Sequence, residues 1–216
     1  MKKNRLLLFT LLIMFVLSGC SSDETQLEDV TTYDWFYQYV VAGLRFGVIT
    51  PKESESSHFE PDRDVTQGEF ITMLGRLHEY GHGAIVALEE GPVYERYIAW
   101  ALANEIIHRY KYWDLMPCAP LTREQKAMII CRYICIFNLF TYFVHEYHIS
   151  SMAFWDYYEM SYWARGPVES LRYLLLVYSR YGRYFVPHAT STRAEAVAII
   201  SGVGSAIYDL VHPLPR

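Results

Sequence analysis

Three stretches of the chain share one pattern of polar and apolar positions. Each opens with a Thr that is followed three residues later by Glu or Gln, and apolar residues then recur five, seven and eight positions after the Thr. Apolar residues at these offsets lie on one face of a helix with 3.6 residues per turn. The pattern therefore predicts three amphipathic helices, which begin after Thr66, Thr122 and Thr192.

The openings themselves are capping boxes. In this motif the Thr hydroxyl accepts a hydrogen bond from the backbone three residues on, and the Glu or Gln side chain at that position bonds back to the Thr amide. The predicted pairs are Thr66 with Glu69, Thr122 with Gln125, and Thr192 with Glu195. Three such boxes in a short chain indicate an internal repeat.

The residues before each box repeat as well. An aromatic-rich segment predicted to be helical (residues 35–48, 100–107 and 163–178) is followed by a Pro-containing turn (residues 58–62, 116–120 and 184–188). The predicted unit is thus two helices joined by a turn, about 55 residues long, with an insertion before the third copy. The expected boundaries are repeats at 28–83, 94–140 and 153–209, linkers at 84–93 and 141–152, and a tail at 210–216.

These motifs resemble the S-layer homology (SLH) family. The resemblance rests on the Trp-Ala pair that opens 100–107, on Phe59-Glu60-Pro61-Asp62, and on Thr192-Arg193-Ala194-Glu195, and it extends over almost the whole chain after residue 20. It implies an all-α fold in which three SLH repeats form a pseudo-threefold body around a central three-helix bundle. It also implies that grooves between repeats bind a secondary cell-wall polysaccharide, typically a pyruvylated glycan.

The resemblance further implies which residues contact that glycan. An Arg at the first helical position, beside free backbone amides, suits a carboxylate. Arg123 and Arg193 occupy that position, whereas Gln67 replaces the Arg in the first repeat, so that groove is expected to have lost its charge. The alternative is that these residues are only exposed first-turn residues. Trp35, Trp100 and Trp163 are candidates for the groove walls, with core packing as the alternative.

The first 20 residues read as an export signal. Lys2, Lys3 and Arg5 precede an apolar run at 6–17, which is too short to span a membrane, and small residues then lead to Cys20. This arrangement resembles a lipobox, in which Cys20 carries the lipid, and an ordinary secretory signal is the alternative. We expect residues 1–20 to be the lipoprotein signal peptide, cleaved so that Cys20 becomes the first residue of the mature protein, and residues 21–27 to be a tether. The protein is then expected to be extracytoplasmic, anchored to the membrane by lipid and associated with the cell wall.

Charge limits the partners. The chain from Cys20 onward has 16 Lys and Arg against 24 Asp and Glu, a formal charge of −8. Nucleic acid requires a basic face, so no nucleic-acid partner is expected. An acidic polymer would need a local basic site. Hydrophobic residues make up 52% of the sequence, enough to form a packed core.

Two motifs resemble zinc-binding patterns. For the reasons that follow, we expect neither to bind zinc, and we expect no other metal or cofactor. His78-Glu79-Tyr80-Gly81-His82 fits the H-E-x-x-H pattern of zinc proteases, but Gly81 and Gly83 place it where the helix that begins after Thr66 should end. Cys131 and Cys135, with His145 and His148, could also be drawn as a zinc site. Structural zinc sites place their Cys pairs on turns, so the pair reads better as small core residues.

The sequence therefore predicts a non-catalytic envelope lipoprotein that ties membrane to wall. A second hypothesis is a degenerate SLH body that serves as a protein-interaction module, with an envelope protein as its partner. The loss of Arg at Gln67, and Glu105 in place of the usual Gly, favour that alternative. A zinc metalloprotease that uses His78, Glu79 and His82 is the third.

Overall fold

The structure, a computed structural model, describes residues 27–49, 58–85, 92–109, 111–139 and 154–211. This part of the chain contains helices and isolated β-bridges but no strand, so the all-α prediction is confirmed. The helices are α2 (Tyr37–Arg45), α3 (Gln67–His82), α4 (Val93–Ala103), α5 (Arg123–Ile136), the short 3₁₀ helix η2 (Tyr157–Glu159), α7 (Tyr162–Tyr173) and α8 (Arg193–Val211).

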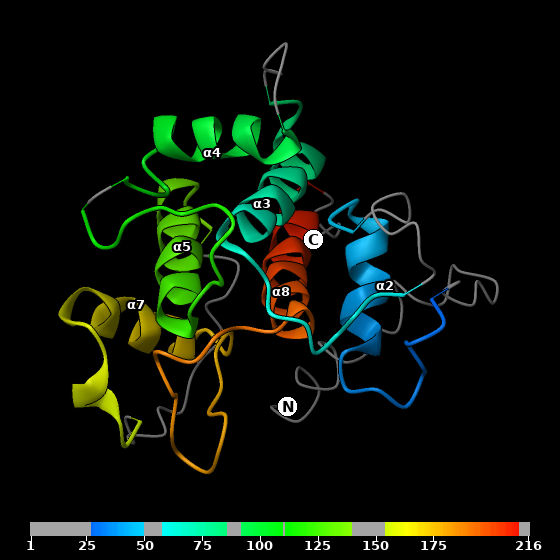
Figure 1. The fold of residues 1–216 in the computed structure, drawn as a ribbon. Helices are drawn as coiled ribbons and strands as arrows, with labels where there is room; N and C mark the ends of the chain where they lie inside the picture. Colours follow the sequence, from blue (N-terminus) through cyan, green and yellow to red (C-terminus); the bar gives the residue numbers. More distant parts are fainter. Residues whose placement is uncertain (1–26, 50–57, 86–91, 110, 140–153, 212–216) are drawn as a thin grey trace, which may run out of the picture.

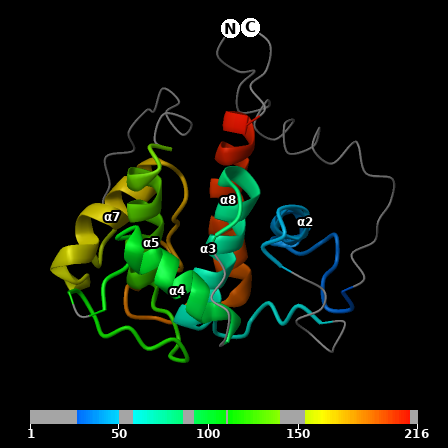
Figure 2. The ribbon, with the colours of Figure 1, turned by 90° about the horizontal axis from the view of Figure 1, so that it is seen from above.

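The three capped helices α3, α5 and α8 form the inner layer, with α8 packed against both of the others (Figures 1 and 2). Residues at matching offsets from the three Thr residues meet in the core. Leu74, Ile130 and Ile200, each eight positions after its Thr, are fully buried. The apolar stripe seen in the sequence is therefore the surface through which the inner helices contact the rest of the protein.

Each outer helix packs mainly on an inner helix of a different repeat. Helix α4 of the second repeat packs on α3 of the first, α7 of the third packs on α5 of the second, and α2 of the first packs on α8 of the third. The last contact includes a hydrogen bond of 2.9 Å from the Ser201 hydroxyl to the Tyr39 carbonyl. The first and last repeats are thus joined directly, and the three repeats close into a ring.

Backbone hydrogen bonds follow the same cyclic order. The Val65 amide donates to the Ser191 carbonyl, the Ser191 amide to Leu121, and the Leu121 amide to Val65, each over 2.9 Å. Two residues further on, the rule repeats: the amides of Gln67, Arg123 and Arg193 donate to the carbonyls of Ala119, Ala189 and Arg63, respectively. These cyclic hydrogen bonds are what a pseudo-threefold arrangement would produce. The pseudo-threefold symmetry of the whole body stays a prediction.

The first helix of the second repeat was predicted at 100–107, opened by Trp100, and this placement was wrong. Each outer helix is followed by a residue with positive φ, namely Gly47, Glu105 and Leu175. Trp35 and Trp163 stand 12 residues before that residue, whereas Trp100 stands five before it. Helix α4 accordingly begins at Val93, inside the expected linker, and Trp100 lies near its C-terminal end rather than at its start. Trp100 is not the counterpart of the other two Trp residues.

Candidate functional site

The capping boxes stabilise the N-termini of the inner helices. Reciprocal bonds between the Thr and the Glu or Gln three residues later are present in α3 and α5, and Thr192 and Glu195 make the same two bonds in α8. The side chain at the first helical position then enters the loop of the next repeat. We call these places the 1–2, 2–3 and 3–1 junctions, occupied by Gln67, Arg123 and Arg193.

At the 2–3 junction Arg123 is only 6% exposed. Its guanidinium donates to the Phe185 carbonyl (2.7 Å) and the Tyr178 carbonyl (2.8 Å), and it pairs with the Glu195 carboxylate (3.1 Å). The alternative that Arg123 is an exposed first-turn residue is therefore wrong. All three nitrogens of its guanidinium are bonded to protein groups.

The Glu195 carboxylate is surrounded by cations. Lys126 Nζ and Arg180 Nη2 lie 3.4 and 3.8 Å from its oxygens, in addition to Arg123. Burial raises the pKa of Glu195, but Lys126, Arg123 and Arg180 outweigh that effect and leave the pKa lowered. Burial, partly offset by Glu195, lowers the pKa of Lys126 to about 8. Near neutral pH this cluster therefore carries more positive than negative charge.

The other two junctions differ in chemistry. At the 3–1 junction Arg193 lies 3.9 Å from Glu69 and over the ring of Phe59, and Arg63 makes a bidentate pair with the same carboxylate. At the 1–2 junction the Gln67 side chain is buried and accepts a bond from the Met116 amide (3.2 Å). Trp113 also donates to the Gln67 side chain (3.4 Å), and both donors to Gln67 among the described residues are uncharged.

The three Trp candidates lie in different environments. Trp35 is exposed, Trp100 is buried against Tyr133 and His78, and Trp163 is half-buried with its ring 5.2 Å from that of Trp113. Trp163 lies near a first-position residue through Trp113, which donates to Gln67. In the described part of the chain the rings of Trp35 and Trp100 instead contact Phe36 and Tyr39, and His78 and Tyr133, respectively. Their role as glycan contacts stays a prediction.

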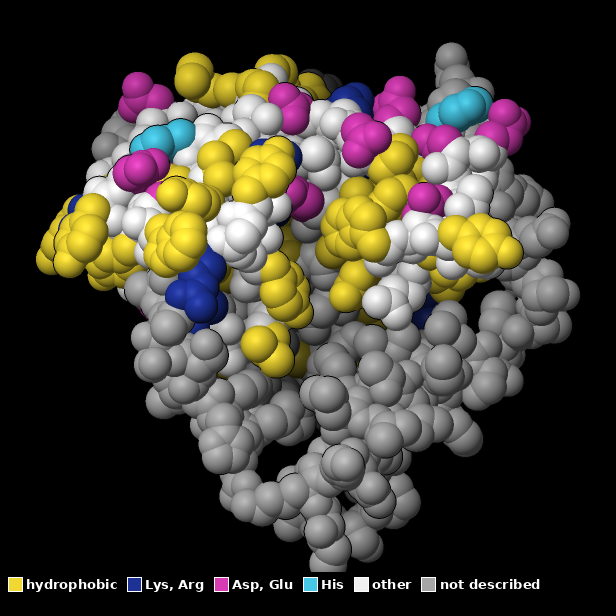
Figure 3. Space-filling model, turned by 90° about the horizontal axis from the view of Figure 1, so that it is seen from below, with side chains coloured by type: hydrophobic (Ala, Val, Ile, Leu, Met, Phe, Trp, Pro, Cys, Tyr) yellow, Lys and Arg dark blue, Asp and Glu magenta, His cyan; other side chains and the backbone are white. Residues whose placement is uncertain are grey.

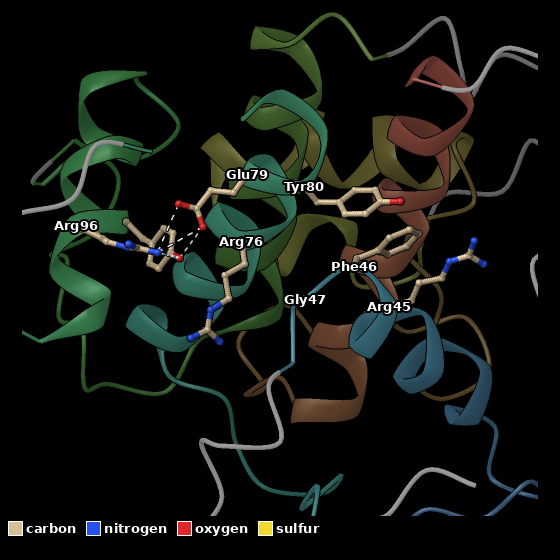
Figure 4. Close-up of a pocket in the computed structure, with 8 residues that line it drawn as sticks. Arg45, Phe46, Gly47, Arg76, Glu79, Tyr80 and Arg96 are labelled. Atoms are coloured by element: carbon tan, nitrogen blue, oxygen red, sulfur yellow. Dashed lines mark hydrogen bonds and ion pairs between the residues drawn. The ribbon is translucent and has the colours of Figure 1, made fainter. Parts of the chain in front are cut away.

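A concave site lies elsewhere, at the C-terminal ends of α2 and α3 and the start of α4 (Figure 4). This hollow is shallow and widely open to solvent, with a volume of about 420 Å³. Three arginines line it, with one carboxylate and three aromatic rings: Arg45, Arg76 and Arg96, then Glu79, then Phe46, Tyr80 and Tyr97. Three cations against one anion make it an anion-favouring site in an acidic protein.

The geometry of Arg96 is set by its neighbours. Its guanidinium stacks over the ring of Tyr97 at 4.4 Å and pairs with the Glu79 carboxylate at 3.4 Å. Tyr97 in turn donates a hydrogen bond of 2.9 Å to Glu79. The Arg96 Nε is buried and has no hydrogen-bond partner among the described residues. The hollow thus contains a cation held in place by Glu79 and Tyr97.

The H-E-x-x-H segment serves packing in this fold. Helix α3 ends at His82, as the glycines predict, and the ring of His78 stacks on His82 at 4.5 Å and contacts Phe137 at 4.6 Å. Burial and the neighbouring His82 lower the pKa of His78 to about 4. Glu79 faces the hollow instead. Within the described ranges no group of three or more His, Cys, Asp and Glu side chains could hold a metal ion.

The remaining candidates are Cys residues or lie outside the described residues. Cys131 is buried, burial raises the pKa of its thiol to about 12, and Cys135 and Cys118 are exposed. His145, His148, Cys20 and residues 21–26 of the expected tether lie outside the described ranges. No helix in the described part of the chain is long and apolar enough to cross a membrane.

Sequence reasoning missed two carboxylates that hold the turns. Asp29 accepts from the amides of Phe59 and Glu60, and Asp156 accepts from those of Phe185 and Val186, over 2.6 to 2.9 Å. Glu60 and Val186 have positive φ, so each carboxylate stabilises a left-handed turn. The signal was present, because Asp29 and Asp156 stand 30 and 29 residues before the Phe of their repeats.

The chain is similar to parts of two much longer enzymes. Over 151 residues, 68% of its length, it is 30% identical to an amylopullulanase of Thermoanaerobacterium thermosulfurigenes. A stretch of the same length is 28% identical to the exoglucanase XynX of Acetivibrio thermocellus. The matched residues make up only 8% and 13% of those proteins. No protein-family model matches the chain.

Proposed function

We infer that the chain is a non-catalytic envelope protein of the SLH type that binds an acidic cell-wall polymer, with the hollow between α2, α3 and α4 as its anion site. The observation that carries this proposal is that Arg76 and Arg96 line one concave surface beside a single carboxylate, with Arg45 at its edge and turned toward Tyr208. A carboxylated sugar offers a matching anion, and the ring of Tyr80 offers an apolar face for the sugar.

The similarities support a module that accompanies catalysis rather than performing it. Two enzymes named for different glucan-cleaving activities match this chain, and in each the match is about a tenth of the length. A short region common to both is more simply a part that attaches them to a surface. The repeats and the cyclic hydrogen bonds are further support for the SLH reading.

The hollow replaces the first-position arginines as the leading site. Arg123 already bonds to protein groups through all three nitrogens, so binding an anion there would break existing bonds. Arg96 has a donor that no described residue uses. Glu79 and Tyr97 hold Arg96 at the hollow, so an anion bound there would meet a cation whose position is already fixed, which favours affinity.

Sedimentation of the protein with purified cell walls tests this function. Arg76→Ala and Arg96→Ala should each weaken wall binding about tenfold, because a hydrogen bond to a charged group contributes about 1.5–3 kcal/mol. Arg109→Ala removes an exposed arginine outside the hollow and should leave binding unchanged. Equal wall binding by all four proteins would reject the hollow, and failure of the wild type to bind walls would favour the protein-interaction module.

A further inference from the structure

The third repeat exposes a group of aromatic side chains that the hollow does not use. Trp155, Tyr158 and Tyr162 are 64%, 83% and 87% exposed, and Tyr181 and Tyr184 are exposed as well. We call these five side chains the aromatic face. Aromatic rings at such exposure are costly to leave in water as a group, and exposed apolar patches on soluble proteins mark interaction sites.

Three members of the aromatic face, Trp155, Tyr181 and Tyr184, are in contact with one another. The rings of Trp155 and Tyr184 lie 5.4 Å apart, and Tyr184 forms a backbone bridge with Tyr181. Arginines are interleaved with the rings. Arg183 lies over Trp155 at 5.7 Å, and Arg165 lies over Tyr158 at 5.7 Å.

The geometry argues against a sugar-stacking platform. Arg183 lies over Trp155, and Tyr184 meets that ring edge-on at 87°, so no flat pair of rings is offered. The composition instead fits the headgroup region of a bilayer. All five members are Tyr or Trp, which combine an apolar ring with a polar edge and concentrate at membrane interfaces, and long Arg side chains extend their charges to phosphates.

The course of the chain brings this side of the molecule toward a membrane. Tyr33, 97% exposed, and the exposed Trp35 lie shortly after the first described residue, Leu27. The start of α2, the 154–162 segment and the 178–190 loop all lie on the lower side of Figure 1, and Figure 3 shows hydrophobic side chains spread over that side. The six residues between Cys20 and Leu27 span at most about 20 Å when extended, so a lipid on Cys20 would hold the body close to the bilayer.

We propose that the aromatic face of the third repeat rests on the headgroup region of a lipid bilayer, while the hollow points away from it. The two sites lie at opposite ends of the helices. The 154–162 segment and the 178–190 loop lie on the lower side of Figure 1, whereas the hollow lies where α2 and α3 end, on the upper side. The membrane contact and the polymer contact can therefore be made at the same time.

Flotation with vesicles tests the proposal on residues 21–216, which include every described residue and no lipid. This protein should float with phosphatidylcholine vesicles, and Trp155→Ser, Tyr158→Ser and Tyr162→Ser combined should lower the partition coefficient about tenfold through lost apolar burial. Brominated lipids should quench wild-type fluorescence more than that of Trp155→Phe. Binding should persist at about 0.5 M salt, because charge attraction is screened there and ring burial is not.

Tyr80→Ser is the matched control, since it removes an exposed Tyr at the opposite end, in the hollow. It should leave flotation unchanged and weaken wall binding, whereas the triple variant should do the reverse. This double comparison keeps a failure of the membrane contact distinct from a failure of the polymer site. Absence of flotation, equal flotation of the triple variant, or a dimer that the triple variant abolishes would each overturn the proposal.

Discussion

Arg123 and Glu195 come from different repeats, and their Nη1 and Oε1 atoms lie 3.1 Å apart. Arg123 is the first helical residue of one inner helix, and Glu195 is the capping residue of the next. Arg193 bears the same relation to Glu69, at 3.9 Å. The remaining repeat has Gln67 at the first position, and the capping residue of the repeat after it is Gln125. The one repeat without the Arg therefore precedes the one repeat without the Glu.

This relationship gives Gln67 an explanation other than a lost glycan contact. A buried cation is costly without an anion beside it, so Gln at the first position is consistent with Gln, rather than Glu, at the capping position of the next repeat. Gln67→Arg alone should destabilise the protein by about 2–4 kcal/mol, since it would bury an unpaired charge. Adding Gln125→Glu should recover most of that loss. A double-mutant cycle measured by urea unfolding checks this, and strict additivity of the two changes would contradict it.

The residues after the outer helices predict a gain in stability. Leu175 has φ of 56° and is 54% exposed, whereas the first repeat has Gly47 at this place. The left-handed conformation costs a side-chain-bearing residue about 1–2 kcal/mol, and the extra freedom of Gly in the unfolded chain offsets part of that. Leu175→Gly should thus stabilise the protein by about 0.5–1 kcal/mol in urea unfolding. Leu175→Ala keeps the strain and should show no such gain.

The hydrogen bonds of the Asp156 carboxylate predict that removing this side chain destabilises the protein. Asp156 is 2% exposed and accepts from the amides of Phe185 and Val186, the second of which has positive φ. Asp156→Ala would leave both donors without a partner and should cost about 3 kcal/mol. Asp114→Ala, at an exposed position, is the control and should cost little. Equal midpoints for the two variants in thermal unfolding would show that Asp156 does not hold the turn.

The pair of stacked histidines predicts a dependence on pH. The pKa of His78 is lowered from 6.5 to about 4, chiefly by burial and then by His82. The unfolded chain therefore binds a proton near pH 6.5 that the folded protein does not yet bind, and stability falls as the pH drops between these values. The loss should be on the order of 1–2 kcal/mol, because the ring is partly exposed and solvent screens the effect.

Unfolding free energies at pH 7 and pH 5 measure this loss. Glu69 and Glu195 have pKa values lowered from 4.5, so their contribution is lost only at more acidic pH and does not obscure the comparison. His82 and His108 also have pKa values lowered from 6.5, so His78→Gln should reduce the difference between the two pH values without removing it. A wild type equally stable at both would contradict the neutral, buried state of His78.

Much of the fold follows from the sequence because its signals are local. Capping boxes and the apolar stripes after Thr66, Thr122 and Thr192 place the inner helices correctly, and periodicity alone identifies the buried face. The start of α4 was missed because its signal, Pro92 ahead of Val93, was weaker than the attraction of the Trp-Ala pair at Trp100. The Trp-Ala pair matched the family motif, but it lies near the end of its helix and not at the start.

The candidate site could be predicted less well, because it depends on which elements meet. An apolar stripe shows that a helix face is buried but not against which partner, so nothing local reveals that α4 packs on α3 of another repeat. That contact brings Arg96 to Glu79 and creates the hollow. For the same reason the inward course of Arg123, toward the Phe185 and Tyr178 carbonyls, could not be read from its position in the motif.

The contact between α2 and α8 has a consequence for how such a protein can change in size. A repeat protein that stacks in a line offers a free surface at each end, and further copies can be added there one at a time. Here α2 of the first repeat covers the surface of α8 that the third repeat would otherwise present. A fourth copy would have to open that contact before it could join, so growth by single repeats is blocked. Duplication of the whole ring, as a separate body, is the change that this architecture allows.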